Sequence, residues 1–241
     1  MNLRVSATAA EATVECGRHI LVLLEDAMAA GARATLAISG GSTPAPMFAY
    51  FALEEFPWDR VHLFWVDERA VPPDHPHSNF KLAQDIWLGP AQVPAANIHR
   101  IRGELPPQEA ARSYSEGIRL FFGLAARELP CFEVVHLGMG RDAHTASLFP
   151  GEPKIDDHEN IAAAVWAEPA AQWRVTLLPG VLEAARHTVV LAAGTDKIPA
   201  LEAVRHGPYD PKRYPAQLAS REGSGAAWFV DQGAVGGTAS C

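Results

Sequence analysis

The sequence predicts an α/β fold in which helices cover a mostly parallel sheet. Strand-like and helix-like segments alternate along the chain, and the strand-like segments are apolar on both faces. Hydrophobic residues make up 48% of the 241 residues, which is enough for one large core. The Pro- and acid-rich stretch 150–160 is only a weak boundary, so we expect one domain over residues 1–232 and a flexible tail over 233–241.

Each expected element follows from its periodicity. Residues 11–30 have helical periodicity, with Val14, Ile20, Leu21 and Leu24 on one apolar face. Further helices are expected at 44–55, 80–88, 109–128 and 197–205. Strands are expected at 35–39, 61–66, 97–101, 132–137, 188–193 and 226–230, with further apolar segments around Val165 and at 175–178.

Charge and cysteine content exclude several classes of protein. The net charge of -8 argues against a nucleic-acid or anionic membrane surface. No stretch is long and apolar enough to cross a membrane. Cys16, Cys131 and Cys241 match no metal-ligand or redox spacing, which indicates reduced thiols. The N-terminus has no apolar run behind a basic start, so we expect no signal peptide and a cytoplasmic protein.

Unusual residues follow three of the predicted strands, at the carboxyl ends where open α/β sheets bind ligands. The first group is the loop 39–44. Gly40 and Gly41 let the backbone approach a ligand, and Ser42 and Thr43 offer hydroxyl groups. A helix that starts at Pro44 would present free N–H groups to an anion. By itself, this loop fits a phosphate site and an ordinary capped turn equally well.

The second group is Asp67, Glu68 and Arg69, directly after the strand 61–66. These charges lie where sites form, although a solvated ion pair in a loop is the commoner outcome for such residues. His75 and His77 flank a proline farther along, but two histidines without another well-spaced ligand are weak evidence. We therefore expect no metal.

The third group, residues 138–144, contains the best acid/base candidate. Its glycines fit the dinucleotide pattern, but the second strand that this pattern requires is missing, so a nicotinamide enzyme is not favoured. An imidazole can take a proton from water and return it to a leaving oxygen, and Asp142 stands close to His144. Without further context, a structural histidine would be the commoner outcome.

Two cations near later strands are candidates to hold a phosphate. Arg174 precedes the segment 175–178, and Lys197 follows the turn after the strand 188–193. Taken alone, an arginine or lysine in such a position is more often an ordinary surface charge than a phosphate ligand. The chain contains neither the nucleophile motif Gly-x-Ser-x-Gly nor a Walker A sequence.

Together these segments resemble the glucosamine-6-phosphate isomerase/6-phosphogluconolactonase family. The matching motifs span nearly the whole chain in the family's order, at 39–44, 66–72 with Ser78 and Asn79, 138–151, 174–177, 194–197 and 228–231. The sequence Asp-Glu-Arg at 67–69, where the deaminases have Asp-Glu-Tyr, favours the lactonase branch. Two departures are Leu178-Pro179, where a Thr-Leu-Thr motif would continue, and Ala143, where the family usually has glycine. A positive φ at Ala143 would cost energy.

The resemblance implies a Rossmann-like three-layer α/β/α fold with a small additional lobe. It also implies hydrolysis of 6-phospho-D-glucono-1,5-lactone to 6-phosphogluconate in the oxidative pentose phosphate pathway, without a cofactor. In this scheme His144 activates water, Asp142 orients His144, and Asp67 lies close to the reacting end. The substrate would be held by Gly40, Gly41, Ser42, Thr43, Arg69, Asn79, Arg174 and Lys197.

The expected partner is a small sugar-phosphate lactone, with no nucleic acid and no membrane, and the expected state is a monomer or small homo-oligomer. Two alternatives stay open. One is a sugar-phosphate isomerase or deaminase on the same scaffold, in which Asp67 would move a proton at C2. The other is a non-catalytic sugar-phosphate sensor.

Overall fold

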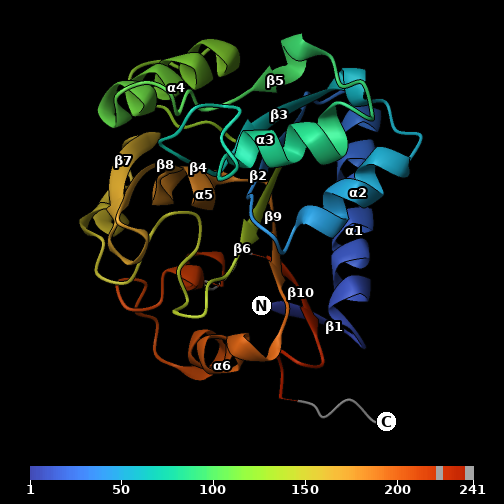
Figure 1. Ribbon diagram of the computed structural model, residues 1–241, viewed down its shortest axis with the longest axis vertical. Helices are drawn as coiled ribbons and strands as arrows, with labels where there is room; N and C mark the ends of the chain where they lie inside the picture. The colour runs from blue at the N-terminus through green and yellow to red at the C-terminus, as the bar shows by residue number, and fades with distance from the viewer. Residues whose placement is uncertain (221–224, 237–241) are drawn as a thin grey trace.

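A seven-stranded sheet, parallel throughout, forms the centre of the protein (Figure 1). The computed structural model describes residues 1–220 and 225–236. In spatial order the strands are β1 (Asn2–Ser6), β10 (Ala227–Asp231), β9 (His187–Ala192), β6 (Val134–Gly138), β2 (Ala34–Ile38), β3 (Val61–Trp65) and β5 (Ile98–His99). The predicted α/β fold with a mostly parallel sheet is confirmed.

Helices flank this sheet on both sides. α1 (Ala9–Ala29) and α2 (Ala45–Leu53) lie together on one side, and α4 (Pro107–Phe122) and α5 (Pro179–Ala184) lie on the other (Figure 1). The remaining α-helices of the described ranges are α3 (Asn79–Ala83) and α6 (Ile198–His206). Thr8 and Glu11 form a capping box at the start of α1, whose buried face includes Cys16, Ile20 and Leu24. Val14, predicted on this face, is only partly buried.

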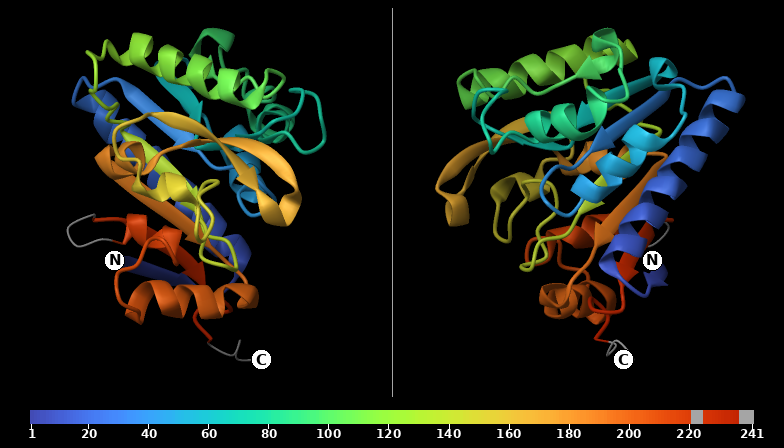
Figure 2. Two further views of the ribbon diagram at one scale, coloured as in Figure 1. Left: turned by 90° about the vertical axis from the view of Figure 1, so that its left-hand side faces the viewer. Right: turned by 45° about the vertical axis from the view of Figure 1, so that its right-hand side comes forward.

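A small antiparallel sheet forms the additional lobe, with strand order β4 (Asp67–Arg69), β8 (Gln172–Leu177) and β7 (Ala162–Ala167). The β7–β8 hairpin projects from the body of the protein (Figure 2). In the register of β4 and β8, Arg69 pairs with Arg174 and Asp67 pairs with Thr176. The small sheet therefore brings two separate sequence motifs side by side.

The structure corrects several sequence predictions. The helix expected at 109–128 ends at Phe122, because Gly123 adopts a left-handed conformation with φ 67. The helix expected at 80–88 is α3 followed by a π-helical turn, Gln84–Leu88. Asp67 and Glu68 are 5% and 2% exposed in β4, so they do not form a solvated loop. The strand β1 and the helix α5 were not predicted.

Other predictions are tested only in part. No helix in the described ranges is long and apolar enough to span a membrane. Cys16 and Cys131 are free thiols, whereas Cys241 lies outside the described residues. The same holds for residues 237–241 of the predicted tail. Within the described part, Ala234 of that segment is fully buried.

Candidate active site

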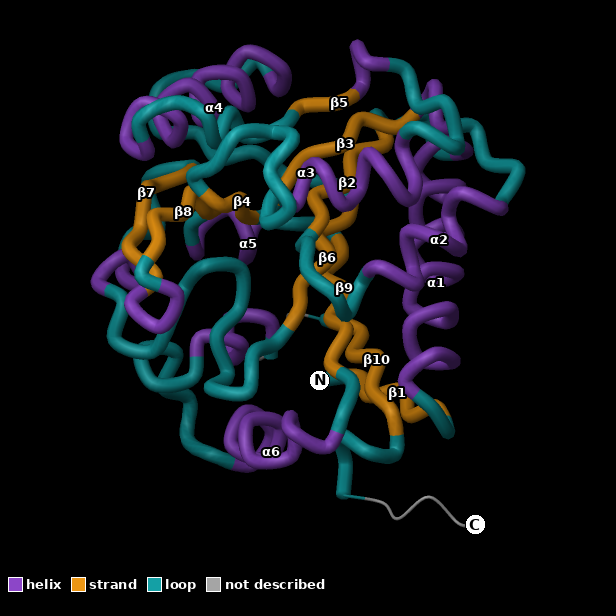
Figure 3. Tube along the Cα trace, viewed as in Figure 1, coloured by secondary structure: helices purple, strands orange, loops and turns teal. Residues whose placement is uncertain are grey.

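The strands β2, β6 and β9 lie together near β4 and β8 of the small sheet (Figure 3). A cleft of about 290 Å³ opens at the carboxyl ends of these three strands. This volume suits a ligand the size of a sugar phosphate. Ten of the eleven predicted site residues line it: Gly40, Gly41, Ser42, Thr43, Asp67, Arg69, Asn79, His144, Arg174 and Lys197. The eleventh, Asp142, contacts His144. The cleft thus gathers residues that lie far apart in the sequence.

The loop 39–44 joins β2 to α2 and forms one wall of the cleft. Gly41 has a φ of 103, a conformation that favours glycine. At Gly40, a Cβ atom would lie 2.2 Å from the side chain of Asn79, so only glycine allows this approach. No side chain caps the N-terminus of α2. Its N–H groups are therefore suited to an anion.

His144 is held on the loop after β6 by its neighbour Asp142. The Nδ1 atom of His144 lies 2.6 Å from Oδ1 of Asp142, and the same oxygen accepts a hydrogen bond from the backbone N–H of His144. Burial raises the pKa of Asp142, but the hydrogen bond and charge of His144 outweigh it and lower the pKa to about 2. An ionised Asp142 requires the proton on Nδ1, which leaves Nε2 as the basic nitrogen.

Ala143, which stands where the family usually has glycine, adopts a left-handed backbone conformation. Its φ is 64, its side chain is buried, and its carbonyl oxygen accepts a hydrogen bond from the backbone N–H of Ala216. A left-handed conformation costs an alanine about 1–2 kcal/mol. The turn forms despite this cost, because the N–H groups of Ala143 and Gly140 bond across it to the carbonyl oxygens of Gly140 and His144.

Asp67 faces the cleft within a buried polar network. The hydroxyl of Ser147 donates a 2.6 Å hydrogen bond to Oδ2 of Asp67, and Nη1 of Arg174 lies 3.8 Å from the same oxygen. The side-chain amide of Asn79 donates to the carbonyl oxygen of Asp67. These contacts fix the carboxylate of Asp67 and balance its charge.

Glu68 points away from the cleft and organises the segment around it. Its two carboxylate oxygens accept hydrogen bonds from the backbone N–H groups of Arg69, Asn79 and Phe80 and from the hydroxyl of Ser78. Burial raises the pKa of Glu68, and these hydrogen bonds oppose the rise. Glu68 thereby fixes Arg69 and Asn79, which both line the cleft.

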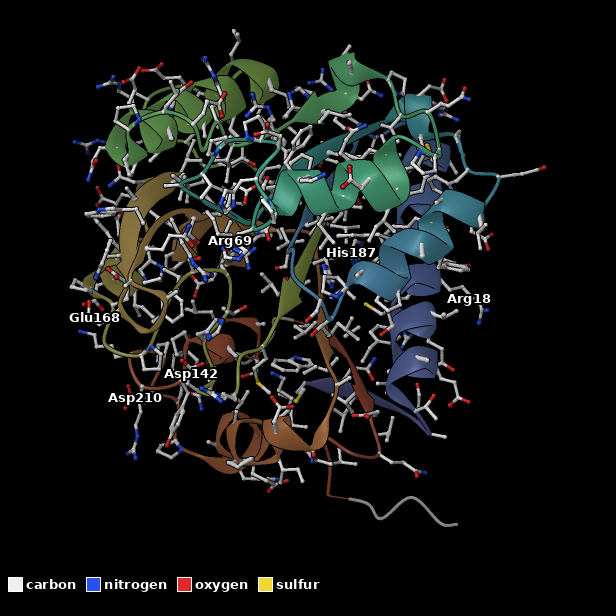
Figure 4. All side chains as sticks on the ribbon, in the orientation of Figure 1. Arg18, Arg69, Asp142, Glu168, His187 and Asp210 are labelled. Carbon is white, nitrogen blue, oxygen red and sulfur yellow. The ribbon has the colours of Figure 1, made fainter. Side chains whose placement is uncertain are left out.

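The cations of the cleft retain free donors. Figure 4 shows Arg69, on the small sheet, and Asp142, on the loop after β6. Arg69 donates from Nη1 to the carbonyl oxygen of His77, while its buried Nε has no partner among the described residues, and the same is true of Nε of Arg174. Lys197 contacts only the exposed Asp196 among described ion-pair partners, at 3.1 Å. These donors make the cleft locally suited to an anion.

Several residues of the site were not predicted from the sequence. His136, Ala146 and Leu191 also line the cleft, and Ser147 supports Asp67. Ser39 and Met139 line it too, from within the predicted groups 39–44 and 138–144. His136 had a visible signal, because it is a lone polar residue in an apolar strand. Ser147 had none, since its partner lies 80 residues away in the chain.

The weaker site predictions have structural explanations. His75 accepts a hydrogen bond from the backbone N–H of His77, so the pair shapes its own loop. Within residues 1–220 and 225–236, no group of three or more His, Cys, Asp or Glu side chains is arranged to hold a metal. Where a dinucleotide fold would have its second strand, the chain forms the 3-10 turn Pro153–Asp156.

Comparison with known proteins places these motifs in a family. A 6-phosphogluconolactonase of Nostoc sp. is 37% identical over 216 residues, covering 89% of each chain. One of Synechocystis sp. is 36% identical over 207 residues, covering 86% of this chain and 85% of the relative. A 6-phosphogluconolactonase structure from Thermotoga maritima, 26% identical, superposes with a TM-score of 0.83 over 95% of this chain and 99% of that one. The family model described as glucosamine-6-phosphate isomerases/6-phosphogluconolactonase matches residues 7–228, and the chain belongs to this family.

Proposed function

We propose that the protein hydrolyses 6-phospho-D-glucono-1,5-lactone to 6-phosphogluconate, a step of the oxidative pentose phosphate pathway. The observation that carries the proposal is the 2.6 Å contact between His144 and Asp142 in a cleft whose other wall is the N-terminus of α2. The relatives above 30% identity that carry the lactonase name support the same activity.

His144 is the general base of the proposed reaction. Its Nε2 takes a proton from water as the water oxygen attacks the C1 carbonyl. The bond between C1 and the ring oxygen then breaks, and the imidazolium returns its proton to that oxygen. Asp142 stabilises the imidazolium and keeps the ring in the required tautomer. Arg69 is positioned to stabilise the oxyanion, and Asp67 lies near the reacting end.

The phosphate group anchors the substrate in this scheme. Gly40 to Thr43 and the N-terminus of α2 bind it, together with Arg174 and Lys197, while Asn79 completes the wall. Anchoring the phosphate fixes C1 relative to His144 and converts the attack into a reaction between positioned groups. The predicted cytoplasmic location and the predicted monomer or small homo-oligomer remain predictions.

The test is an assay on freshly prepared lactone, with acid release followed at constant pH and the spontaneous rate subtracted. His144→Ala should lower kcat by about 10²–10⁴-fold, the usual contribution of a general base. A variant within a few-fold of the wild type would remove His144 from this role. Arg174→Ala should mainly raise KM, and an unchanged KM would remove Arg174 from the phosphate site.

The same assay addresses the two alternatives. Ammonia release from glucosamine 6-phosphate would indicate a deaminase, and binding of 6-phosphogluconate without any enzyme-dependent hydrolysis would indicate a sensor. The lactonase names of the relatives make both less favoured.

A further inference from the structure

His136 is a buried imidazole in the wall of the cleft that the proposed reaction does not use. It lies on β6, is 1% exposed, and lines the cleft with Ser39 and Leu191. Neither of its ring nitrogens has a hydrogen-bond partner among the described residues. Burying an imidazole without partners is costly, so this side chain calls for an explanation that packing alone does not give.

The place of β6 in the sheet indicates which part of a ligand His136 meets. β6 lies between β2, which leads into the loop 39–44, and β9, which leads into the turn that carries Lys197. Both the N–H and the hydroxyl of Ser39 donate hydrogen bonds to the carbonyl oxygen of His136, each at 3.1 Å. His136 is thus tied to the base of the loop that binds the phosphate in the proposed function.

The protonation state of His136 decides what its ring offers. Burial lowers the pKa of His136 to about 4, so the ring is neutral near pH 7 and carries one N–H donor. A phosphate oxygen is a strong acceptor for such a donor, whereas the neighbouring Leu191 offers no polar group.

We propose that His136 is a further phosphate-binding residue, whose ring N–H donates a hydrogen bond to a phosphate oxygen of the bound substrate at the base of the loop 39–44. The proposal rests on the proposed function for the identity of the ligand as a sugar phosphate. It concerns how the phosphate is held and not the chemistry at C1.

The central experiment compares the wild type with His136→Leu, which removes both ring nitrogens but keeps an apolar side chain. Losing a hydrogen bond to a charged group should raise both KM and the dissociation constant of inorganic phosphate about tenfold to a hundredfold in this variant. The phosphate is bound in both the ground state and the transition state, so kcat should change little. Phosphate binding is measured directly by calorimetry. Unchanged phosphate affinity in His136→Leu would overturn the proposal.

Two variants separate this role from a structural one. His136→Gln retains a neutral donor and should keep more of the phosphate affinity than His136→Leu. His99→Leu removes another partly buried imidazole, on β5 at the far edge of the sheet, and should bind phosphate like the wild type. Two results would contradict a specific hydrogen bond from His136. One is an equal loss of phosphate affinity in His136→Gln and His136→Leu, and the other is a similar loss in His99→Leu.

A measurement on the wild type covers the case in which His136→Leu does not fold. Inorganic phosphate added to protein labelled with ¹⁵N-histidine should shift the ring resonances of His136, and a titration without that shift would also overturn the proposal. The proposed function can fail separately. A wild type that binds phosphate through His136 but does not hydrolyse the lactone refutes only the activity, whereas an active enzyme with an unaffected His136→Leu variant refutes only this inference.

Discussion

A single added methyl group at Gly140 should disable the proposed base without removing any chemical group. A Cβ atom at this position would lie 2.1 Å from Nδ1 and 2.2 Å from Cε1 of His144, and 2.6 Å from Oδ1 of Asp142. Side-chain contacts of this kind ordinarily begin at 3.4 Å. Because Gly140 does not have a positive φ, the backbone itself accepts alanine, and the effect is purely spatial.

The size of the effect follows from the displacement. The imidazole and the carboxylate must both retreat from the new methyl group, which breaks the 2.6 Å contact between them. A misplacement of about 1 Å in an active site can cost about 10²-fold in rate, so we expect kcat of Gly140→Ala to fall by at least that factor. KM should change less, since the phosphate-binding loop 39–44 lies on another strand end.

The assay is acid release from fresh lactone at constant pH, corrected for spontaneous hydrolysis, with the melting temperature measured in parallel. Gly117→Ala is the control, because a Cβ atom there also meets nothing within 4 Å, and Gly117 lies on α4 and does not line the cleft. It should keep most of the wild-type kcat. A folded Gly140→Ala variant with kcat close to the wild type would show that the geometry of the His144–Asp142 pair does not control the reaction.

Three further predictions concern strain, a buried carboxylate and a buried imidazole. Ala143 has a φ of 64, so Ala143→Val should lower the free energy of unfolding, because a β-branched side chain tolerates this conformation less well than alanine. Ala143→Gly removes the strain of about 1–2 kcal/mol but adds backbone entropy to the unfolded chain, so it should equal or exceed the wild type in urea unfolding, and a clearly less stable glycine variant would contradict the strain. Glu68→Gln replaces an acceptor oxygen with an amide, so it should cost about 1–3 kcal/mol and raise KM as Arg69 and Asn79 shift; a variant equal to the wild type in both would contradict the role of Glu68. Burial lowers the pKa of His136 from 6.5 to about 4, so between these pH values the imidazole is protonated in the unfolded chain but neutral in the folded protein. The free energy of unfolding of the wild type therefore decreases as the pH falls from about 6.5 to about 4. In urea unfolding, the free energy of unfolding of His136→Leu relative to the wild type should rise by about 2–3 kcal/mol as the pH is lowered from about 7.5 to about 4.5. Parallel pH profiles of the two proteins would refute a lowered pKa at His136.

Most of the fold could be predicted because its signals are local. The buried strands β2, β3, β6 and β9 are short apolar runs, and such runs need no knowledge of their partners to be recognised. The edge strand β1 was missed because most of its residues are exposed, so its sequence lacks the continuous apolar run of the central strands. The π-helical turn at Gln84–Leu88 was missed for a different reason, since its hydrophobic spacing resembles that of an α-helix.

The location of the site could be predicted for a topological reason. Parallel strands place their carboxyl ends at one edge of a sheet, so motifs that follow different strands must meet there. The supporting contacts could not be predicted in this way. The contact of Ser147 with Asp67 depends on the register of the small sheet, and that register is set by packing between distant segments. The orientation of Glu68 away from the cleft likewise depends on the helix α3 that it caps.

These supporting contacts explain how a protein with a net charge of -8 can offer a site for an anion. The two carboxylates nearest the cations of the small sheet are already engaged, because Glu68 accepts its hydrogen bonds internally and Asp67 accepts one from Ser147. These two carboxylates therefore accept hydrogen bonds from fixed protein donors. The buried Nε atoms of Arg69 and Arg174, in contrast, have no hydrogen-bond partner in the described part of the chain. An anion entering the cleft therefore meets Arg69, Arg174 and Lys197 beside Asp67, whose Oδ2 already accepts a hydrogen bond from Ser147. The local arrangement of donors, and not the overall charge, determines which ligand this cleft accepts.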